Sequence, residues 1–287
     1  MNSSLRLRKL IATDLPFADS LRAQAGWNQT LADWQRFLAM DPEGCFLAEW
    51  NGAPAGTATT TIYGPQLAWI GMVLVDPDYR RRGIGRALLQ RCIDYLQGQK
   101  VRCIKLDATP LGQPVYAGLG FKDEWTLTRW ERAGAGLCGV PASSGMRPWR
   151  EGDERRIAPL DALAFGVPRQ RLMRALAQES RGALVLEHEA DQPVAFGLLQ
   201  NGSSALHLGP IVAASADCAI RLIEALLTRG DAERVLWDIP DPNAAAREWA
   251  EHNGFTRQRS LTRMYLGENG TPGDPQKQFA LAGPEVG

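Results

Sequence analysis

The stretch that decides the fold is Arg80-Arg81-Arg82-Gly83-Ile84-Gly85, which lies between an apolar run at residues 69–75 and a helical pattern at residues 87–96. A glycine-rich turn that opens a helix points several unpaired backbone N–H groups at one place, where the helix dipole also favours an anion. The glycines remove side chains that would block the approach of that anion. The stretch therefore predicts a phosphate-binding loop.

The spacing separates this loop from two common nucleotide-binding motifs, because it lacks the Gly-Lys-Ser/Thr of a P-loop and the third glycine of a Rossmann motif. It matches R-x-x-G-x-G after a Val-rich strand, and so resembles motif A of the GNAT acyltransferases, whose loop binds the pyrophosphate of acetyl-coenzyme A. Arg80 stands at the family's Gln/Arg position, and Gly83 and Gly85 stand at its two glycines. An ordinary strand-to-helix turn with a basic helix start is the alternative.

The resemblance implies that acetyl-CoA is the acyl donor. In a GNAT fold the strand at 68–75 and the strand at 101–108 splay apart, which leaves backbone groups that the pantetheine arm can satisfy. The expected cofactor-binding residues are Val73, Leu74, Val75, Arg80, Arg81, Arg82, Gly83, Ile84, Gly85 and Arg86.

Tyr116 is the expected catalytic residue. It stands four residues before Gly120-Phe121, where many GNAT enzymes carry a tyrosine near the coenzyme A sulfur, and the resemblance implies that its phenol protonates the leaving thiolate. The alternative is a tyrosine that packs on a short helix, with its hydroxyl bonded to a backbone carbonyl.

The general base is not evident, because the strand at 69–75 offers no Glu or His where several relatives carry one. Asp107, Glu49 and Glu285 are candidates, a chain of waters is the alternative, and Asp76 is expected to face the loop. Trp27 and Asn28 lie where GNAT folds place a substrate-contacting loop, so they are expected to bind the acceptor. Helix capping by Thr30, with Trp27 covering the sheet edge, explains them equally well.

An internal repeat divides the chain in two. Arg8, Asp14 and Pro54 recur at one spacing as Arg147, Asp153 and Pro193, and Gly120-Phe121 and Leu127-Thr128-Arg129 recur as Gly254-Phe255 and Leu261-Thr262-Arg263. A domain-sized period with two copies indicates a duplicated α/β unit rather than a solenoid.

The order of predicted elements is the GNAT order, so the expected fold class is α/β (α+β), with two tandem GNAT folds that each hold a mixed, mainly antiparallel sheet flanked by helices. The expected domains are a catalytic domain at 1–133, a linker at 134–145, a degenerate GNAT-like domain at 146–267 and a C-terminal segment at 268–287 that docks or frays.

The second copy is expected to have lost the loop. Aligning the copies puts Cys218, Arg221 and Ile223 where the first has Arg80, Gly83 and Gly85, and puts Ala250 at the tyrosine position. This domain is therefore expected to bind no acetyl-CoA and to shape the substrate pocket of the first, with His207, Asp238 and Arg263 as contacts.

Composition sets further limits. With 287 residues, 45% hydrophobic content and zero formal charge, the chain has room for two domains with their own cores, and the balanced charge argues against nucleic acid as a partner. Neither a membrane span nor a signal peptide is evident, so a cytoplasmic location and no membrane partner are expected. The scattered cysteines and histidines indicate no disulfide framework and no metal site.

These observations predict an N-acetyltransferase that moves an acetyl group from acetyl-CoA directly to a primary amine of a small molecule, in a monomer or a homodimer. Transfer to a protein N-terminus or lysine is one alternative. A module that senses acetyl-CoA without turnover is another.

Overall fold

The computed structural model describes residues 4–133, 145–188, 192–229 and 234–287, and it divides into two compact units. The first contains Met1–Asp123, Met264–Gly270 and Val286, and the second contains Glu124–Arg263, Thr271–Glu285 and Gly287. The units differ from the domains expected at 1–133 and 146–267. Residues 124–133 belong to the second unit, and residues 264–270 belong to the first. The expected linker at 134–145 lies outside the described residues except for Gly145.

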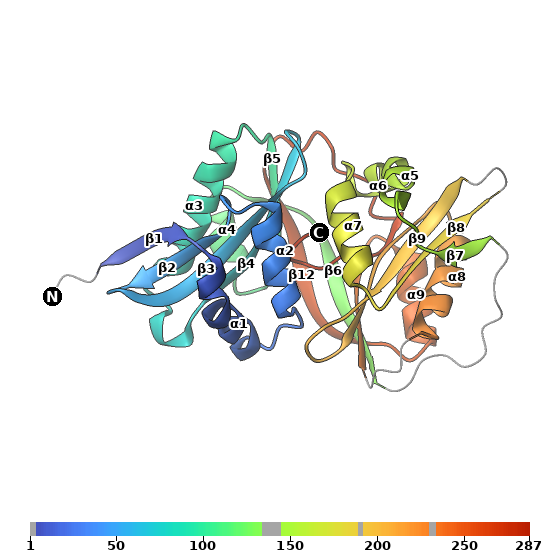
Figure 1. Cartoon of the computed structure of the whole chain (residues 1–287), viewed down its shortest axis with the longest axis horizontal. Helices are drawn as coiled ribbons and strands as arrows, with labels where there is room; N and C mark the ends of the chain where they lie inside the picture. The colour runs from blue at the N-terminus through green and yellow to red at the C-terminus, as the bar shows by residue number, and fades with distance from the viewer. Residues whose placement is uncertain (1–3, 134–144, 189–191, 230–233) are drawn as a thin grey trace. The chain divides into compact units, whose positions relative to one another are not determined.

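The first unit is built on a mixed sheet with the strand order β1-β2-β3-β4-β5, coloured blue to green in Figure 1. Neighbouring strands are antiparallel except β4 and β5, which are parallel. The elements are β1 (Leu5–Lys9), η1 (Ala12–Asp14), α1 (Leu15–Gln24), α2 (Leu31–Met40), β2 (Phe46–Trp50), β3 (Ala53–Ile62), β4 (Leu67–Val75), η2 (Pro77–Tyr79), α3 (Ile84–Gly98), β5 (Cys103–Ala108) and α4 (Gln113–Ala117).

The second unit repeats this plan with the strand order β6-β11-β10-β9-β8-β7, next to β12, and with β13 beside β10. Here β10 and β11 are the parallel pair. The elements are β6 (Lys122–Ala133), β7 (Met146–Pro148), α5 (Asp153–Arg156), α6 (Ala158–Phe165), α7 (Gln170–Glu179), β8 (Gly182–Glu187), β9 (Pro193–Gln200), β10 (Leu206–Ala213), α8 (Ala216–Leu227), β11 (Arg234–Pro240), α9 (Ala244–His252), β12 (Thr256–Gly267) and β13 (Gln278–Ala280). Both sheets are mixed and mainly antiparallel, which confirms the predicted fold class.

Helix α3 forms because its apolar residues recur at helical spacing and bury one face. Ile84, Leu88, Leu89, Cys92, Ile93 and Leu96 are all buried in the core of the first unit. Gly83 precedes the helix in the left-handed region, at φ 79°. The buried face fixes the helix on the sheet, and this places its N-terminus at the end of β4.

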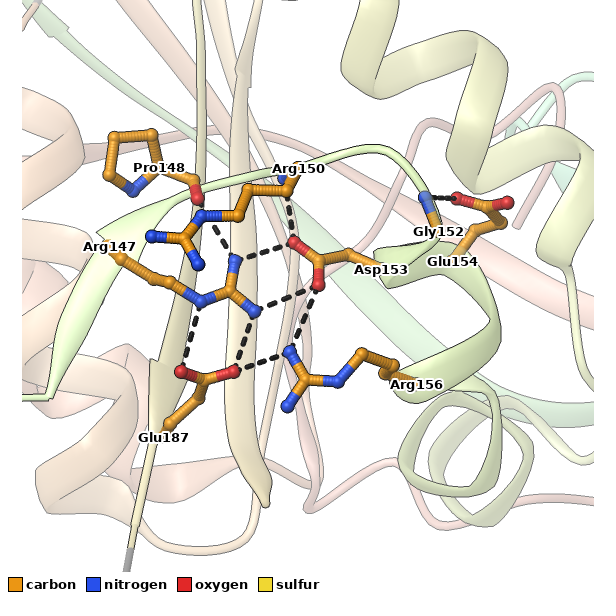
Figure 2. Close-up of polar contacts among 8 residues, drawn as sticks. All are labelled: Arg147, Pro148, Arg150, Gly152, Asp153, Glu154, Arg156 and Glu187. Carbon is orange, nitrogen blue, oxygen red and sulfur yellow. Dashed lines mark hydrogen bonds and ion pairs between the residues drawn. The ribbon is translucent and has the colours of Figure 1, made fainter. Parts of the chain in front are cut away.

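One ion-pair motif appears in both units and supports the duplication. In the second unit the Arg147 guanidinium donates to both oxygens of Asp153 (2.7 and 2.8 Å) and to both oxygens of Glu187 (2.9 and 2.6 Å), as Figure 2 shows. In the first unit Arg8 donates to Asp14 (2.7 and 2.9 Å) and to Glu49 (2.7 Å).

The motif ties β1 to η1 and β2 in the first unit, and β7 to α5 and β8 in the second. Hydrogen bonds from Arg8 hold the pKa of Asp14 below its usual range. Burial raises the pKa of Asp153, but Arg147 and the backbone N–H of Arg150 outweigh burial and lower it overall. Glu49 is therefore a structural partner of Arg8 in this fold, which argues against it as the general base.

Candidate functional site

Strand β4 carries a bulge just before the glycine-rich loop. Thr57 of β3 pairs with Leu74 and Thr59 pairs with Gly71, so Met72 and Val73 together lie opposite Ala58. Met72 has a φ of 50°, which is unusual for a residue with a side chain, and the Thr57 hydroxyl donates to its carbonyl (3.0 Å). The bulge bends the strand and changes the direction of the backbone groups that follow it.

Thr57 supports the bulge, and the sequence did not reveal this contact. It is buried within the run Thr57-Ala58-Thr59-Thr60-Thr61, where alternation alone gives no reason to single it out. Only the register of β3 against β4 shows that its hydroxyl supports the bulge.

The pairing of the parallel strands β4 and β5 ends at Trp69, before the bulge. Their ladder joins Leu67–Trp69 to Cys103–Lys105 and does not continue to the ends of the two strands. Leu74 and Val75 pair with Thr57 and Gly56 on the other side of β4. Their edge toward β5 is therefore a place where an extended ligand with amide groups can add to the sheet.

The loop after β4 presents backbone N–H groups at the start of α3. The first helical hydrogen bond of α3 runs from the Ala87 N–H to the Gly83 carbonyl (3.0 Å), so the N–H groups of Ile84, Gly85 and Arg86 precede it. Arg81 and Gly83 both have left-handed backbone, at φ 60° and 79°. Such a sequence of conformations turns successive N–H groups inward and favours an anion.

The arginines around the loop differ in their contacts. The Arg80 Nε donates to the Val75 carbonyl (3.2 Å), and the Arg82 guanidinium lies over the Trp50 ring, 5.3 Å from its centroid. Arg81 and Arg86 are exposed. Arg80 therefore links the loop to the end of β4, and Arg82 packs against β2.

Tyr116 lies on α4 with its ring against the core of the first unit. The ring is half-buried and lies 6.3 Å from the Phe121 ring, centroid to centroid. Burial raises the pKa of Tyr116 to about 12, so the phenol is protonated at neutral pH. Among the described residues its hydroxyl has no hydrogen-bond partner, so the hydroxyl-to-carbonyl bond of the alternative interpretation is not present.

The start of α3 and the end of α4 lie close together. A Cβ placed on Gly118 would be 3.8 Å from Nη1 of Arg86. The first unit thus combines a helix start with free backbone N–H groups, an open sheet edge and a protonated phenol.

Comparison with known proteins agrees with this geometry in both halves of the chain. Residues 8–121 match the model of the acetyltransferase (GNAT) family, and residues 157–280 match that of an acetyltransferase (GNAT) domain. The [ribosomal protein bS18]-alanine N-acetyltransferase of Escherichia coli is 33% identical over 132 residues, which cover 43% of this chain and 84% of that protein. The chain belongs to the GNAT acetyltransferase family.

Two further relatives match longer stretches of this GNAT protein. An uncharacterized N-acetyltransferase of Bacillus subtilis is 28% identical over 190 residues, 66% of each chain. A holothin acyltransferase of Pseudoalteromonas is 25% identical over 263 residues, 91% of this chain and 87% of its own. A solved protein structure from Pyrococcus horikoshii has the same fold, with a TM-score of 0.84 at 24% identity over 99% of this chain and 96% of that one. The chain is therefore an acyltransferase with two GNAT folds.

The other carboxylates considered for this GNAT protein lie in different surroundings. Asp76 caps η2 by accepting from the Asp78 N–H (2.9 Å), as its place at the strand end predicts. Asp107 is half-buried on β5, and it alternates with Leu106 and Ala108, which face the core with α3. Glu285 is buried in the second unit, where its carboxylate folds over Gly283.

The proposed acceptor loop is tied to the helices on both sides of it. Thr30 and Asp33 form a capping box at α2, so the predicted capping by Thr30 is confirmed. The Trp27 carbonyl accepts from Arg22 (3.1 Å), and Asn28 is buried. This leaves the acceptor-binding role of Trp27 and Asn28 as a prediction.

The second GNAT unit has lost the loop by deletion. Residues 76–83 separate β4 from α3, whereas residues 214–215 alone separate β10 from α8. Cys218, Arg221 and Ile223 lie inside α8, so the alignment that set them opposite Arg80, Gly83 and Gly85 is wrong. Phe255 donates to the Ala250 carbonyl as Phe121 donates to that of Tyr116, which supports Ala250 at the tyrosine position.

The opening between β10 and β11 is filled by the C-terminal segment. Strand β13 pairs with β10 at Ile211 and Val212, and the Leu281 N–H donates to the Asp238 carbonyl on β11 (2.9 Å). This segment takes the place in the second unit that corresponds to the open edge of β4 in the first.

His207, Asp238 and Arg263 have structural contacts in the second unit. Asp238 forms a buried two-bond ion pair with Arg129 (2.7 and 2.6 Å), and His207 Nε2 lies 3.1 Å from the Leu281 carbonyl. Arg263 stacks on the Trp125 ring at 4.2 Å.

No group of three or more metal-binding side chains occurs within the described part of the chain. In that same part, no helix is long and apolar enough to cross a membrane.

Proposed function

We propose that this GNAT protein uses acetyl-CoA to acetylate a primary amine of a small molecule in a direct transfer within its first unit. The observation that carries the proposal is the arrangement at β4, where the bulge, the open edge and the start of α3 follow one another. Such an edge suits the amides of pantetheine, and such a helix start suits a pyrophosphate.

In this proposal each part of the cofactor has its own residues. The N–H groups of Ile84, Gly85 and Arg86 hold the pyrophosphate, with Arg80 and Arg81 as neighbouring positive charges. The backbone of Val73, Leu74 and Val75 pairs with the pantetheine arm. N–H groups of the same strand polarise the thioester carbonyl as the amine attacks.

We infer the class of acceptor from the relative whose similarity extends over both units. The relative that covers 91% of this chain is named for transfer to holothin, whereas the one named for a ribosomal protein covers 43%. This favours a small-molecule acceptor, and transfer to a protein is the second candidate. A cytoplasmic location stays a prediction.

Acetyl-CoA binding and turnover test the proposal together. We expect calorimetric titration to give one high-affinity acetyl-CoA site per chain, and thiol release to rise when suitable amines are added. Two sites of equal affinity would contradict the loss of the loop from the second unit, and no site would remove the cofactor from the proposal. Binding without thiol release across a broad amine and peptide panel would favour a sensor.

Tyr116→Phe is expected to lower kcat by about 10- to 100-fold with acetyl-CoA affinity unchanged, because only the proton donor for the thiolate is removed. Since the pKa of Tyr116 is about 12, the phenol stays protonated through pH 10, and its ionisation produces no alkaline fall in wild-type kcat below that value. Thiol release measured against pH checks both points. An unchanged kcat in the variant would exclude Tyr116 from the reaction.

Asp107 is the carboxylate that we propose to accept the amine proton, because it lies half-buried on β5 beyond the last pair of the β4–β5 ladder. We expect Asp107→Asn to lower kcat/KM for the amine by about 10-fold or more, with most of the loss regained at high pH, where the free amine no longer needs a base. A pH profile of kcat/KM for both proteins measures this. A uniform loss at every pH would instead indicate a structural role.

A further inference from the structure

The second unit contains a pocket of about 640 Å³ that is rich in arginine, and nothing in the proposed reaction uses it. It lies between the end of β7, helix α7 and the end of α8. We call it the arginine groove. Its charged lining residues are Arg150, Glu151, Glu154, Arg155, Arg174, Arg181 and Arg229.

The first unit has a groove of similar volume, about 630 Å³, at the corresponding place. Arg147 follows Arg8 by the same number of residues as α7 follows α2. The residues that line the two grooves can therefore be compared position by position. Leu15, Pro16 and Gln35 in the first correspond to Glu154, Arg155 and Arg174 in the second. A mainly apolar surface has thus become a charged one, although the fold around it does not require that change.

The ion-pair network of Figure 2 lies beside the groove and holds its wall in place. The Asp153 carboxylate accepts from the Arg150 N–H (2.7 Å) and from Arg147 (2.7 Å). Glu154 is buried and accepts from the Gly152 N–H (3.2 Å) and from Arg174 (2.7 Å). The backbone that carries Arg150 and the guanidinium of Arg174 is therefore fixed before any ligand arrives.

Positive charge remains after the acidic residues are counted. Arg150, Arg155, Arg174, Arg181 and Arg229 face Glu151 and Glu154, which leaves a surplus of three positive charges in one pocket. Arg181 Nε also donates to the Arg229 carbonyl (3.4 Å), which ties α8 to the start of β8. All the cations are arginine, whose planar guanidinium binds oxyanions through two parallel hydrogen bonds.

We propose that the arginine groove binds a small molecule that carries a diphosphate group. Several guanidinium groups around one concave surface match the clustered oxygens of a diphosphate better than they match a single carboxylate. Trp149, which also lines the groove and packs edge-on against Phe196, offers an apolar wall for the rest of the ligand. This site is separate from the loop of the first unit and does not depend on the proposed transfer reaction.

The test uses inorganic pyrophosphate as the probe and the full chain as the protein. In calorimetry we expect the wild type to bind at two sites, the loop before α3 and the arginine groove, and the Gly83→Glu variant to keep the second. Adding Arg150→Glu and Arg229→Glu to Gly83→Glu should abolish the remaining binding. Gln35→Glu in the same background is the matched control, since Gln35 corresponds to Arg174, and binding should be retained.

Three results would overturn the proposal: no pyrophosphate binding by Gly83→Glu, binding that survives Arg150→Glu/Arg229→Glu, or succinate binding as tightly as pyrophosphate. The third would show an ordinary solvated arginine surface. If the double change unfolds the second unit, Arg155→Glu replaces it, because the Arg155 side chain is 75% exposed. The high-affinity acetyl-CoA site at the loop before α3 should be unchanged in Arg150→Glu/Arg229→Glu, which keeps a failure here distinct from a failure of the proposed function.

Discussion

Gly83→Glu is expected to weaken acetyl-CoA binding by at least about 100-fold. Gly83 has a φ of 79°, and a residue with a side chain costs about 1–2 kcal/mol in that region. The new carboxylate also stands where the proposed pyrophosphate lies, and like charges about 4 Å apart repel by about 4 kcal/mol near a protein surface. Even half of this sum corresponds to about 100-fold in affinity.

A matched control lies on the same helix. Gly98 ends α3, has open space around its Cα and has an ordinary helical backbone, so Gly98→Glu adds the same side chain at the far end. We expect its acetyl-CoA affinity to stay within about twofold of wild type in calorimetry. Equal losses in the two variants would mean that the effect of Gly83→Glu is general destabilisation and does not locate the cofactor.

Asp238→Asn is expected to destabilise the second unit by about 3–5 kcal/mol. The change leaves the Arg129 guanidinium, 4% exposed, without its carboxylate, and an uncompensated buried charge is costly. Urea unfolding measures the loss. Glu251→Gln, which breaks the exposed Arg257–Glu251 pair (2.9 Å), is the control and should cost less than about 1 kcal/mol.

A double replacement separates the charge from the packing. Arg129→Met with Asp238→Leu removes both charges, so we expect it to recover much of the stability that Asp238→Asn loses, since well-packed apolar residues often substitute for a buried pair. If the double variant is no more stable than Asp238→Asn, the cost lies in the shape of the core.

The buried pair also predicts an acid dependence. Burial raises the pKa of Asp238, but Arg129 outweighs burial and holds that pKa below its usual range. A carboxylate of lowered pKa stabilises the fold fully above its unfolded pKa of about 4, and this stability is lost as the pH falls through the folded value. The stability difference between wild type and Asp238→Asn should therefore shrink below about pH 4.

The sequence by itself determined the loop, the duplication and the family. The loop is readable because an R-x-x-G-x-G turn between a strand and a helix acts through its own backbone, whatever surrounds it. The duplication is readable because Arg8 with Asp14 and Arg147 with Asp153 keep both their spacing and their hydrogen bonds. Tyr116 could be found in the same way, by its distance from Gly120-Phe121.

Only the tertiary structure decided which strands pair and what fills each opening. The sequence alone does not reveal the deletion before α8. Without knowing that α8 begins at Ala216, one aligns Cys218 and Arg221 with the glycine-rich loop of the first unit. Three other features depend on residues far apart in the chain. They are the hydrogen bond from Thr57 to Met72, the assignment of residues 124–133 to the second unit and of residues 264–270 to the first, and the pairing of β13 with β10. A strand edge accepts any segment that satisfies its N–H and C=O groups, so the choice is made by the whole fold and not by a local pattern.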